Sequence, residues 1–143
     1  MKKERVDRSL LFLCYGKIRA EVNEMTILVW YPKCSTCQKA KKKLEELKVP
    51  FTLRHIVDET PSVKELQNWM KLGGLELKQL YNTSGNLYKA LNMKEKRKEM
   101  SEEEQLQLLS ENGMLLKRPI LVGEHQALVG YRENAYEEFA KIN

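Results

Sequence analysis

Two cysteines separated by two residues, Cys34 and Cys37, are the side chains of this sequence best suited to chemistry. They lie between a run rich in β-branched and aromatic residues, 26–31, and a run with helical spacing, 40–48. Thiols at this spacing can close a disulfide, supply half of a zinc site, or be buried as small apolar side chains. A helix N-terminus lowers the pKa of a thiol, because the helix dipole favours the thiolate. Their position therefore favours redox chemistry.

The two cysteines are predicted to have different roles. Cys34 lies at or before the first helical turn, where unpaired backbone N–H groups stabilise a thiolate, and Lys33 adds positive charge nearby. Cys34 is therefore the predicted attacking thiol. Cys37, one turn into the helix, is predicted to be less exposed and to resolve the mixed disulfide or sulfenic acid formed on Cys34.

Other kinds of site have less support in the sequence. A structural zinc site needs four ligands, and the remaining cysteine, Cys14, is distant from the pair, so no metal is expected. His55 falls in a strand pattern and His125 in a turn, and structural or surface roles are expected for both, since thiol–disulfide exchange proceeds through the thiolate. A glycine-rich phosphate loop is missing from the sequence, so no bound cofactor is expected.

Composition indicates one domain in a reducing compartment. With 143 residues and 42% hydrophobic content, the chain can form a single core. Three cysteines are too few for a secreted disulfide scaffold, so a cytoplasmic location is expected. The net charge of +5 is modest and coexists with 20 acidic residues, so direct nucleic-acid binding is not predicted.

The first residues differ in composition from the rest of the chain. Residues 1–24 begin with charged side chains and contain the apolar run 10–15, which is too short for a signal peptide or a membrane span. We predict that residues 1–24 form an extension outside the core and that residues 25–143 form a single domain without membrane contact.

The elements that position the cysteines form two halves. The first half reads as strand 26–31, helix 40–48 and strand 51–57, a β-α-β unit whose connection suits a parallel pair. The second half reads as a hairpin of strands 119–122 and 127–129, followed by a helix over 132–142.

A helical insertion, about residues 58–115, separates these halves. Ser62 and Ser101 each begin a capping-box pattern, and Gly73 and Gly113 are expected near the helix ends. Shorter helical pieces over 75–81 and 87–91 are expected on either side of a turn at 82–85.

The predicted fold is α/β and thioredoxin-like, a four-stranded mixed sheet built as β-α-β then β-β-α with the helical insertion between the halves. In such folds the proline that begins the strand facing the cysteines is usually cis, so we predict a cis Arg118–Pro119 bond. Two roles are open for Arg118. It either holds an anion or a glutathione carboxylate over the thiol, or pairs with an acid beside the cysteine loop.

From about residue 25 to its C-terminus the chain resembles the ArsC/Spx family of thioredoxin-like proteins. Three motifs in the family's order carry the resemblance: Tyr31-Pro32-Lys33-Cys34-Ser35-Thr36-Cys37, Leu116-Lys117-Arg118-Pro119-Ile120 and Val129-Gly130-Tyr131. The family contains glutaredoxin-dependent arsenate reductases, Spx-type regulators that bind RNA polymerase and sense oxidation through a CxxC, and small ArsC-like proteins.

Departures from the arsenate reductase pattern narrow the expected function. The resemblance implies one nucleophilic cysteine, matched by Cys34, and three arginines around the oxyanion, of which Arg118 is one. Leu80-Tyr81 stands in the region of the first arginine, and Gly130-Tyr131 in that of the last, with Arg132 one position away. Losing a bidentate arginine is not a conservative change, so efficient arsenate reduction is not expected.

The resemblance therefore implies a thiol–disulfide oxidoreductase of the ArsC-like group. Its expected partners are a small oxidant or disulfide substrate and a reductant of the glutathione, glutaredoxin or thioredoxin type. The alternative is an Spx-like redox-sensing regulator that binds RNA polymerase through a Cys34–Cys37 disulfide switch.

Overall fold

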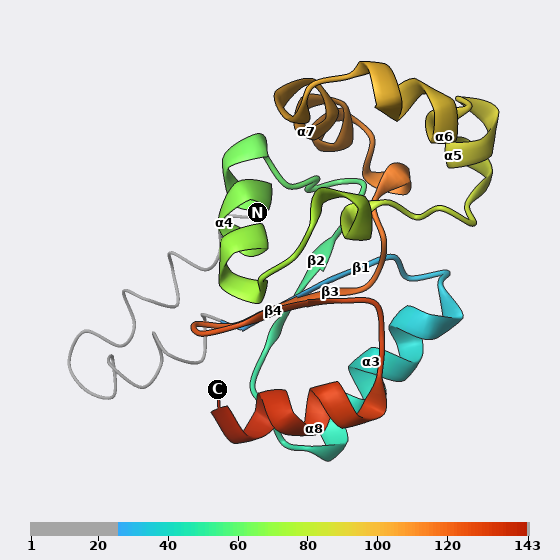
Figure 1. Cartoon of the computed structure of the whole chain (residues 1–143). Helices are drawn as coiled ribbons and strands as arrows, with labels where there is room; N and C mark the ends of the chain where they lie inside the picture. The colour runs from blue at the N-terminus through green and yellow to red at the C-terminus, as the bar shows by residue number, and fades with distance from the viewer. Residues whose placement is uncertain (1–25, 143) are drawn as a thin grey trace.

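A mixed four-stranded sheet forms the centre of the molecule (Figure 1). The computed structural model describes residues 26–142, so the predicted extension 1–24 and Cys14 lie outside the described residues. The strand order is β2-β1-β3-β4, with β1 parallel to β2, and β3 antiparallel to both β1 and β4. The strands are β1 (Ile27–Trp30), β2 (Thr52–His55), β3 (Ile120–Val122) and β4 (Ala127–Val129). The predicted order, β-α-β then β-β-α, is confirmed.

Two helices cover one face of the sheet, α3 (Ser35–Glu46) and α8 (Glu133–Ile142) (Figure 1). Strand side chains alternate between faces, so Leu28 of β1 and Leu121 of β3 point to the same side. There they form one apolar cluster with side chains of the two helices: Ala40, Leu44, Tyr136 and Phe139. This cluster holds the cysteine-bearing helix α3 on the sheet.

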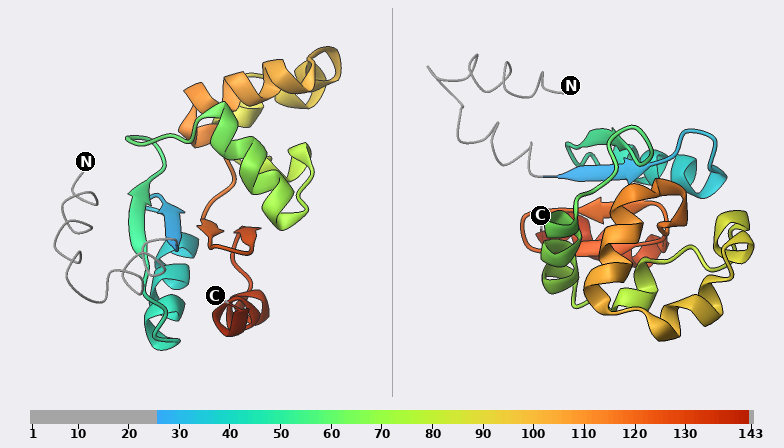
Figure 2. Two further views of the ribbon diagram at one scale, coloured as in Figure 1. Left: turned by 90° about the vertical axis from the view of Figure 1, so that its left-hand side faces the viewer. Right: turned by 90° about the horizontal axis from the view of Figure 1, so that it is seen from above.

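The helical insertion covers the opposite face, as the left view of Figure 2 shows. It consists of α4 (Val63–Gly73), η1 (Leu77–Leu80), α5 (Asn86–Ala90), α6 (Met93–Lys96), η2 (Arg97–Glu99), α7 (Glu102–Glu111) and η3 (Gly113–Leu115). The other alternating strand residues, among them Val29 and Ile120, pack against it in a second, larger cluster. The sheet thus separates two apolar cores.

Capping explains where the two longer insertion helices begin. The Ser62 hydroxyl accepts the Glu65 N–H while the Glu65 carboxylate accepts the Ser62 N–H, and Ser101 and Glu104 repeat this arrangement at α7. Each pair satisfies backbone donors that a helix leaves unpaired at its start. Both predicted capping boxes are confirmed.

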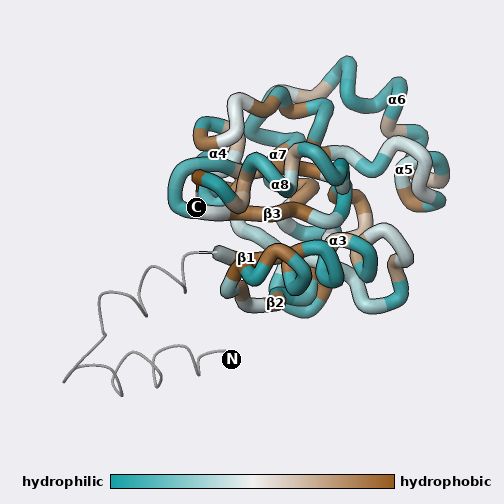
Figure 3. Tube along the Cα trace, turned by 90° about the horizontal axis from the view of Figure 1, so that it is seen from below, coloured by the Kyte–Doolittle hydropathy of each residue, from teal (hydrophilic) through white to brown (hydrophobic). Residues whose placement is uncertain are grey.

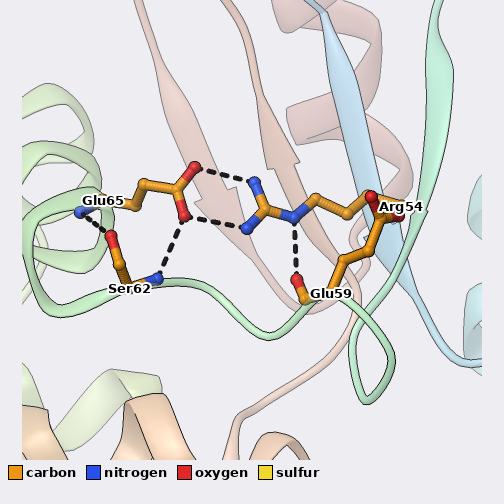
Figure 4. A network of polar contacts seen from close by, with 4 residues as sticks. All are labelled: Arg54, Glu59, Ser62 and Glu65. Atoms are coloured by element: carbon orange, nitrogen blue, oxygen red, sulfur yellow. Dashed lines mark hydrogen bonds and ion pairs between the residues drawn. The ribbon is translucent and has the colours of Figure 1, made fainter. Parts of the chain in front are cut away.

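A polar network ties β2 to the start of α4 (Figure 4). Arg54 donates from both terminal nitrogens to the Glu65 carboxylate at 2.8 Å, and its Nε donates to the Glu59 carbonyl at 2.8 Å. The Arg54 hydrogen bonds hold the pKa of Glu65 below its ordinary range, although partial burial opposes them. This forked pair fixes the insertion on the edge of the sheet remote from β4.

Gly113 marks a place where two backbones come into contact. A Cβ built there would overlap the carbonyl oxygen of Ile56, just beyond β2, and lie 3.2 Å from Thr60 Oγ1. Glycine is therefore required by close approach and not by a left-handed backbone. Gly73 approaches the Ala127 carbonyl of β4 in the same way.

The hydropathy of the trace follows this layering (Figure 3). Hydrophobic residues colour β3, whereas α6 is largely hydrophilic. None of the described helices is long and apolar enough to cross a membrane.

Some element boundaries differ from the predictions. The helix expected over 40–48 already begins at Ser35, because Cys34 caps it. The short turns α6 and η2 have no start signal in the sequence, since Asn92 precedes them in a left-handed conformation without a side-chain cap. The helix beginning at Glu102 ends at Glu111, before Gly113.

Candidate functional site

The turn between β1 and α3 places Cys34 at the N-cap of the helix. Cys34 has an extended backbone, and its Sγ accepts the backbone N–H of Cys37 at 3.4 Å. The turn is held from both sides, because the Cys34 N–H donates to the Tyr31 carbonyl at 2.9 Å and Gln38 Nε2 donates to the Pro32 carbonyl at 2.7 Å. The sulfur thus lies where orphaned helix N–H groups converge.

The two thiols have opposite environments. Cys34 is partly exposed and Cys37 is fully buried, and both are free thiols. Partial burial raises the pKa of Cys34, but hydrogen bonds from the Cys37 thiol and backbone, with the positive charge of Arg118, outweigh it and lower that pKa. Burial raises the pKa of Cys37 to about 12, and hydrogen bonding and negative charge at Cys34 add to the rise. An accessible thiol that ionises more readily than usual is therefore paired with a buried thiol that holds its proton.

Arg118 reaches the thiol from the segment that leads into β3. The Arg118–Pro119 peptide bond is cis, as predicted. The guanidinium carbon lies 5.4 Å from the Tyr31 ring centroid, a cation–π contact. Its Nε and Nη1 atoms are buried and have no hydrogen-bond partner among the described residues. Two donors beside Cys34 are thus available to a ligand.

Arg118 also lines a cavity of about 670 Å³, here called the Arg118 cavity. One part of its wall is polar, formed by Asn82, Ser84 and Asn86. The other part is apolar, formed by Leu87, Ala90 and Met114. Its size suits a small organic molecule with both polar and apolar parts.

Two short segments, 80–84 and 115–118, form a wall between this cavity and a second hollow. Tyr81 and Leu116 pair as an antiparallel bridge, with Asn82 N–H donating to the Leu115 carbonyl and Lys117 N–H to the Leu80 carbonyl. Alternate residues of an extended segment face opposite sides. Asn82 and Arg118 accordingly line the Arg118 cavity, while Tyr81 and Lys117 line the second hollow. In the turn that follows Asn82, Ser84 lines the cavity and Thr83 the hollow.

The other residues considered in the sequence, Lys33, Arg132 and His55, lie in different surroundings. Lys33 is exposed on the turn, next to Cys34 in sequence. Arg132 lines the second hollow and not the Arg118 cavity, so the structure does not bring the two arginines into one cavity. His55 accepts the backbone N–H groups of Val57 and Asp58 through Nδ1, a structural role.

Metal binding finds no support in the described part of the chain, where no three Cys, His, Asp or Glu side chains gather around one point.

No role was predicted from the sequence for the cavity residues Asn82, Ser84, Asn86 and Met114. The segment 82–85 was interpreted only as a turn, and the turn is real, because the Gly85 N–H donates to the Asn82 carbonyl at 3.0 Å. The available signal was the cluster of polar side chains in that turn, since loops at the rim of a sheet often carry binding residues.

Tyr136 of α8 places an unpaired hydroxyl group in the core beside Cys37. Its side chain is fully buried, its hydroxyl has no partner among the described residues, and burial and the nearby Cys37 raise its pKa. An unpaired buried hydroxyl costs about 1 kcal/mol or more, so we expect Tyr136→Phe to raise the free energy of unfolding by about 1 kcal/mol in urea titrations.

The matched control is Tyr81→Phe. The Tyr81 hydroxyl donates to Gln105 Oε1 at 3.0 Å in the core. Its removal leaves that oxygen unpaired, and we expect the free energy of unfolding to fall by about 1 kcal/mol. A loss of stability in Tyr136→Phe as large as in Tyr81→Phe would show that the Tyr136 hydroxyl has a partner.

Comparisons with known proteins agree with this arrangement. The ArsC family profile matches residues 29–139. The protein YusI of Bacillus subtilis is 49% identical over 109 residues, which are 76% of this chain and 92% of YusI. The global transcriptional regulator Spx of the same organism is 30% identical over 115 residues, 80% of this chain and 86% of Spx. A crystal structure of an ArsC family related protein from Bacteroides fragilis superimposes with a TM-score of 0.78 at 47% identity, covering 81% of this chain and 98% of that chain.

Proposed function

Because this chain belongs to the ArsC family, we propose that it is a thiol–disulfide oxidoreductase with Cys34 as nucleophile and Cys37 as resolving thiol. The observation that carries the proposal is the pairing of a partly exposed thiol of lowered pKa with a buried thiol of raised pKa, next to the unpaired donors of Arg118. A thiolate is the species that attacks a disulfide sulfur.

The reaction we propose has two exchange steps. The Cys34 thiolate attacks one sulfur of a disulfide substrate, the S–S bond breaks, and the other sulfur leaves as a thiolate. Cys37 then loses its proton and attacks Cys34, forming the intramolecular disulfide and releasing the second half of the substrate. The substrate gains two electrons in total, and a thiol reductant of the glutathione, glutaredoxin or thioredoxin type returns them to the protein.

The high pKa of Cys37 supports this order of events. A protonated Cys37 donates a hydrogen bond to the Cys34 thiolate in the resting enzyme, which helps to keep Cys34 reactive. When Cys34 forms a mixed disulfide, it no longer carries a negative charge. The part of the Cys37 pKa rise due to that charge disappears, so Cys37 ionises more readily when it is needed.

We propose a low-molecular-mass disulfide or sulfenate with an anionic group as substrate, in place of arsenate. Arg118 can donate to one anionic group from its unpaired Nε or Nη1, and a cavity of about 670 Å³ with amide and apolar walls exceeds what a single oxyanion needs. Tyr81, in the region of another family arginine, is buried and donates to Gln105. Arg132 lines the other hollow.

The pH dependence of Cys34 alkylation tests the proposal, with Arg118→Met as the decisive variant. We expect wild-type Cys34 to ionise below the ordinary thiol value of about 8.5. Removing the positive charge raises the pKa of Cys34, so a smaller fraction is thiolate at neutral pH, and we expect alkylation there to slow about threefold to tenfold.

Lys33→Met is the matched control, because it removes one exposed charge from the same turn. We expect the rate of Cys34 alkylation at neutral pH to change less than twofold in this variant, since exposed charges are screened. A wild-type Cys34 that titrates like a free thiol would refute the redox role, and an equal effect of the two variants would refute the special part of Arg118.

A second candidate function rests on the similarity to Spx. We propose as the alternative a redox-sensing regulator that binds RNA polymerase and responds to oxidation of Cys34 and Cys37 in the cytoplasm. Capture of polymerase subunits by the protein, compared between its reduced and oxidised forms, decides between the two. Redox-dependent capture without turnover of any disulfide would favour the regulator.

A further inference from the structure

The second hollow, on the far side of the wall from Arg118, is a groove of about 740 Å³ that no step of the proposed reaction uses. Its sides come from the end of α4 and η1, and from β4 with residues 130–132. We call it the basic groove, after the four basic side chains that line it: Lys78, Arg97, Lys117 and Arg132.

The charge of the groove is of one sign. Among the described residues no carboxylate lines it, and none of its four basic side chains forms an ion pair within that part of the chain. Two partly buried basic side chains elsewhere are neutralised, Lys43 by Glu133 and Glu137 and Arg54 by Glu65. Unpaired like charges around one hollow attract an anionic partner.

Two tyrosines fix the position of the Arg97 side chain in the groove. Its guanidinium carbon lies 4.9 Å from the Tyr81 ring centroid, and its Nη1 donates to the Tyr88 hydroxyl at 3.1 Å. Its Nε is buried without a partner among the described residues, and so is Oε1 of Gln126, which also lines the groove. The groove therefore holds both an unused donor and an unused acceptor.

The edge strand β4 contributes to the same groove. Hydrogen bonds from Gly130 N–H to the Pro119 carbonyl and from Gly123 N–H to the Gln126 carbonyl set the register with β3. In that register the backbone polar groups of Ala127 and Val129 point away from β3. Gly73 of α4 packs against the Ala127 carbonyl. The backbone of Val129 is therefore the part of this edge that is left for another strand to pair with.

We infer that the basic groove docks an acidic, extended segment of a protein thiol reductant whose sulfur forms a mixed disulfide with Cys34; this rests on the proposed function. Acidic side chains meet the four cations, and the backbone of an extended segment offers both a donor and an acceptor to Val129. A peptide also offers N–H donors to Gln126 Oε1, which a nucleic-acid backbone lacks. Consecutive residues, Lys117 and Arg118, line the groove and the Arg118 cavity, so a segment docked in one lies beside the other.

Binding of a fluorescein-labelled octapeptide of alternating Glu and Val, followed by anisotropy, tests the inference. We expect the triple variant Lys78→Gln/Lys117→Gln/Arg132→Gln to weaken binding at least about tenfold, and added salt to weaken binding to the wild type. The matched control, Lys64→Gln/Lys71→Gln/Lys89→Gln, removes three exposed charges outside the groove and is expected to change affinity less than about twofold. A peptide with proline in place of valine keeps the charges, loses half of its backbone N–H donors and is expected to bind more weakly.

Two further outcomes would overturn the inference. Equal affinity of the triple and control variants would show that the groove is not the docking site. Tighter binding of a short labelled duplex DNA than of the peptide, lost in the triple variant, would show that the groove serves a nucleic acid.

A kinetic arm separates this inference from the proposed function. The same peptide, extended by a cysteine in mixed disulfide with 2-nitro-5-thiobenzoate, is offered alongside the uncharged bis(2-hydroxyethyl) disulfide. We expect the triple variant to raise KM for the peptide about tenfold with kcat unchanged, and to leave the uncharged disulfide unaffected. Peptide binding without reduction of either disulfide would refute the proposed function but not the docking role of the groove. Reduction of both disulfides, with the KM for the peptide unchanged in the triple variant, would refute the docking role but not the proposed function.

Discussion

Replacing Cys34 with serine is expected to reduce disulfide turnover at least about 1,000-fold, because a hydroxyl at the N-cap of α3 cannot ionise to a nucleophile at neutral pH. Serine is a good N-cap residue, so the helix itself should be preserved. The measurement is steady-state reduction of the uncharged disulfide, with the free energy of unfolding checked in parallel. A stable but inactive variant is the expected result.

Cys37→Ser is the matched variant on the next turn of the same helix. It retains the Cys34 nucleophile, so we expect a stoichiometric release of the first thiol followed by a mixed disulfide that accumulates on Cys34. Intact mass spectrometry detects that adduct. Release of the second thiol by Cys37→Ser in a single turnover, at the wild-type rate and with no external thiol, would refute the resolving role, and full activity in Cys34→Ser would refute the nucleophile.

The largest loss of stability is expected from Gly113→Ala. The added methyl group overlaps the Ile56 carbonyl, which cannot move aside easily because the Ile56 N–H is bound to the Trp30 carbonyl at 2.9 Å. Overpacking against backbone costs about 3 kcal/mol, enough to lower the urea midpoint clearly. Since Arg118 follows five positions later, we also expect slower Cys34 alkylation at neutral pH.

Gly74→Ala separates the clash from the general effect of replacing a glycine. Gly74 has a positive φ of 60°, but a Cβ there meets nothing within 4 Å. The cost should be that of the left-handed conformation alone, about 1 kcal/mol. If Gly113→Ala loses no more stability than Gly74→Ala, the close approach to Ile56 is not a constraint.

Features specified by neighbouring residues could be predicted from the sequence. The position of Cys34 at a helix start, the capping boxes at Ser62 and Ser101 and the hairpin of β3 and β4 all depend on residues within a few positions of each other. Local hydrogen bonds decide such features, and the sequence displays both partners together.

The surroundings of the thiol could not be predicted in the same way. The wall pairs residues 80–82 with 115–117, more than thirty positions away, and this pairing helps to decide which side chains share a cavity. Arg132, one position from the region of the last family arginine, lines the groove and not the Arg118 cavity. Arg97 had no predicted role, because only the folded chain places it against Tyr81.

The two apolar cores on opposite faces of the sheet bear on how such a protein can change over evolutionary time. One core, with Leu28 and Leu121, anchors the thiol helix, and the other, with Val29 and Ile120, anchors the insertion that shapes both hollows. Substitutions in one core can be absorbed locally, because the two sets of side chains do not interdigitate. A lineage can therefore remodel its choice of ligand while it inherits the reactive sulfur unaltered.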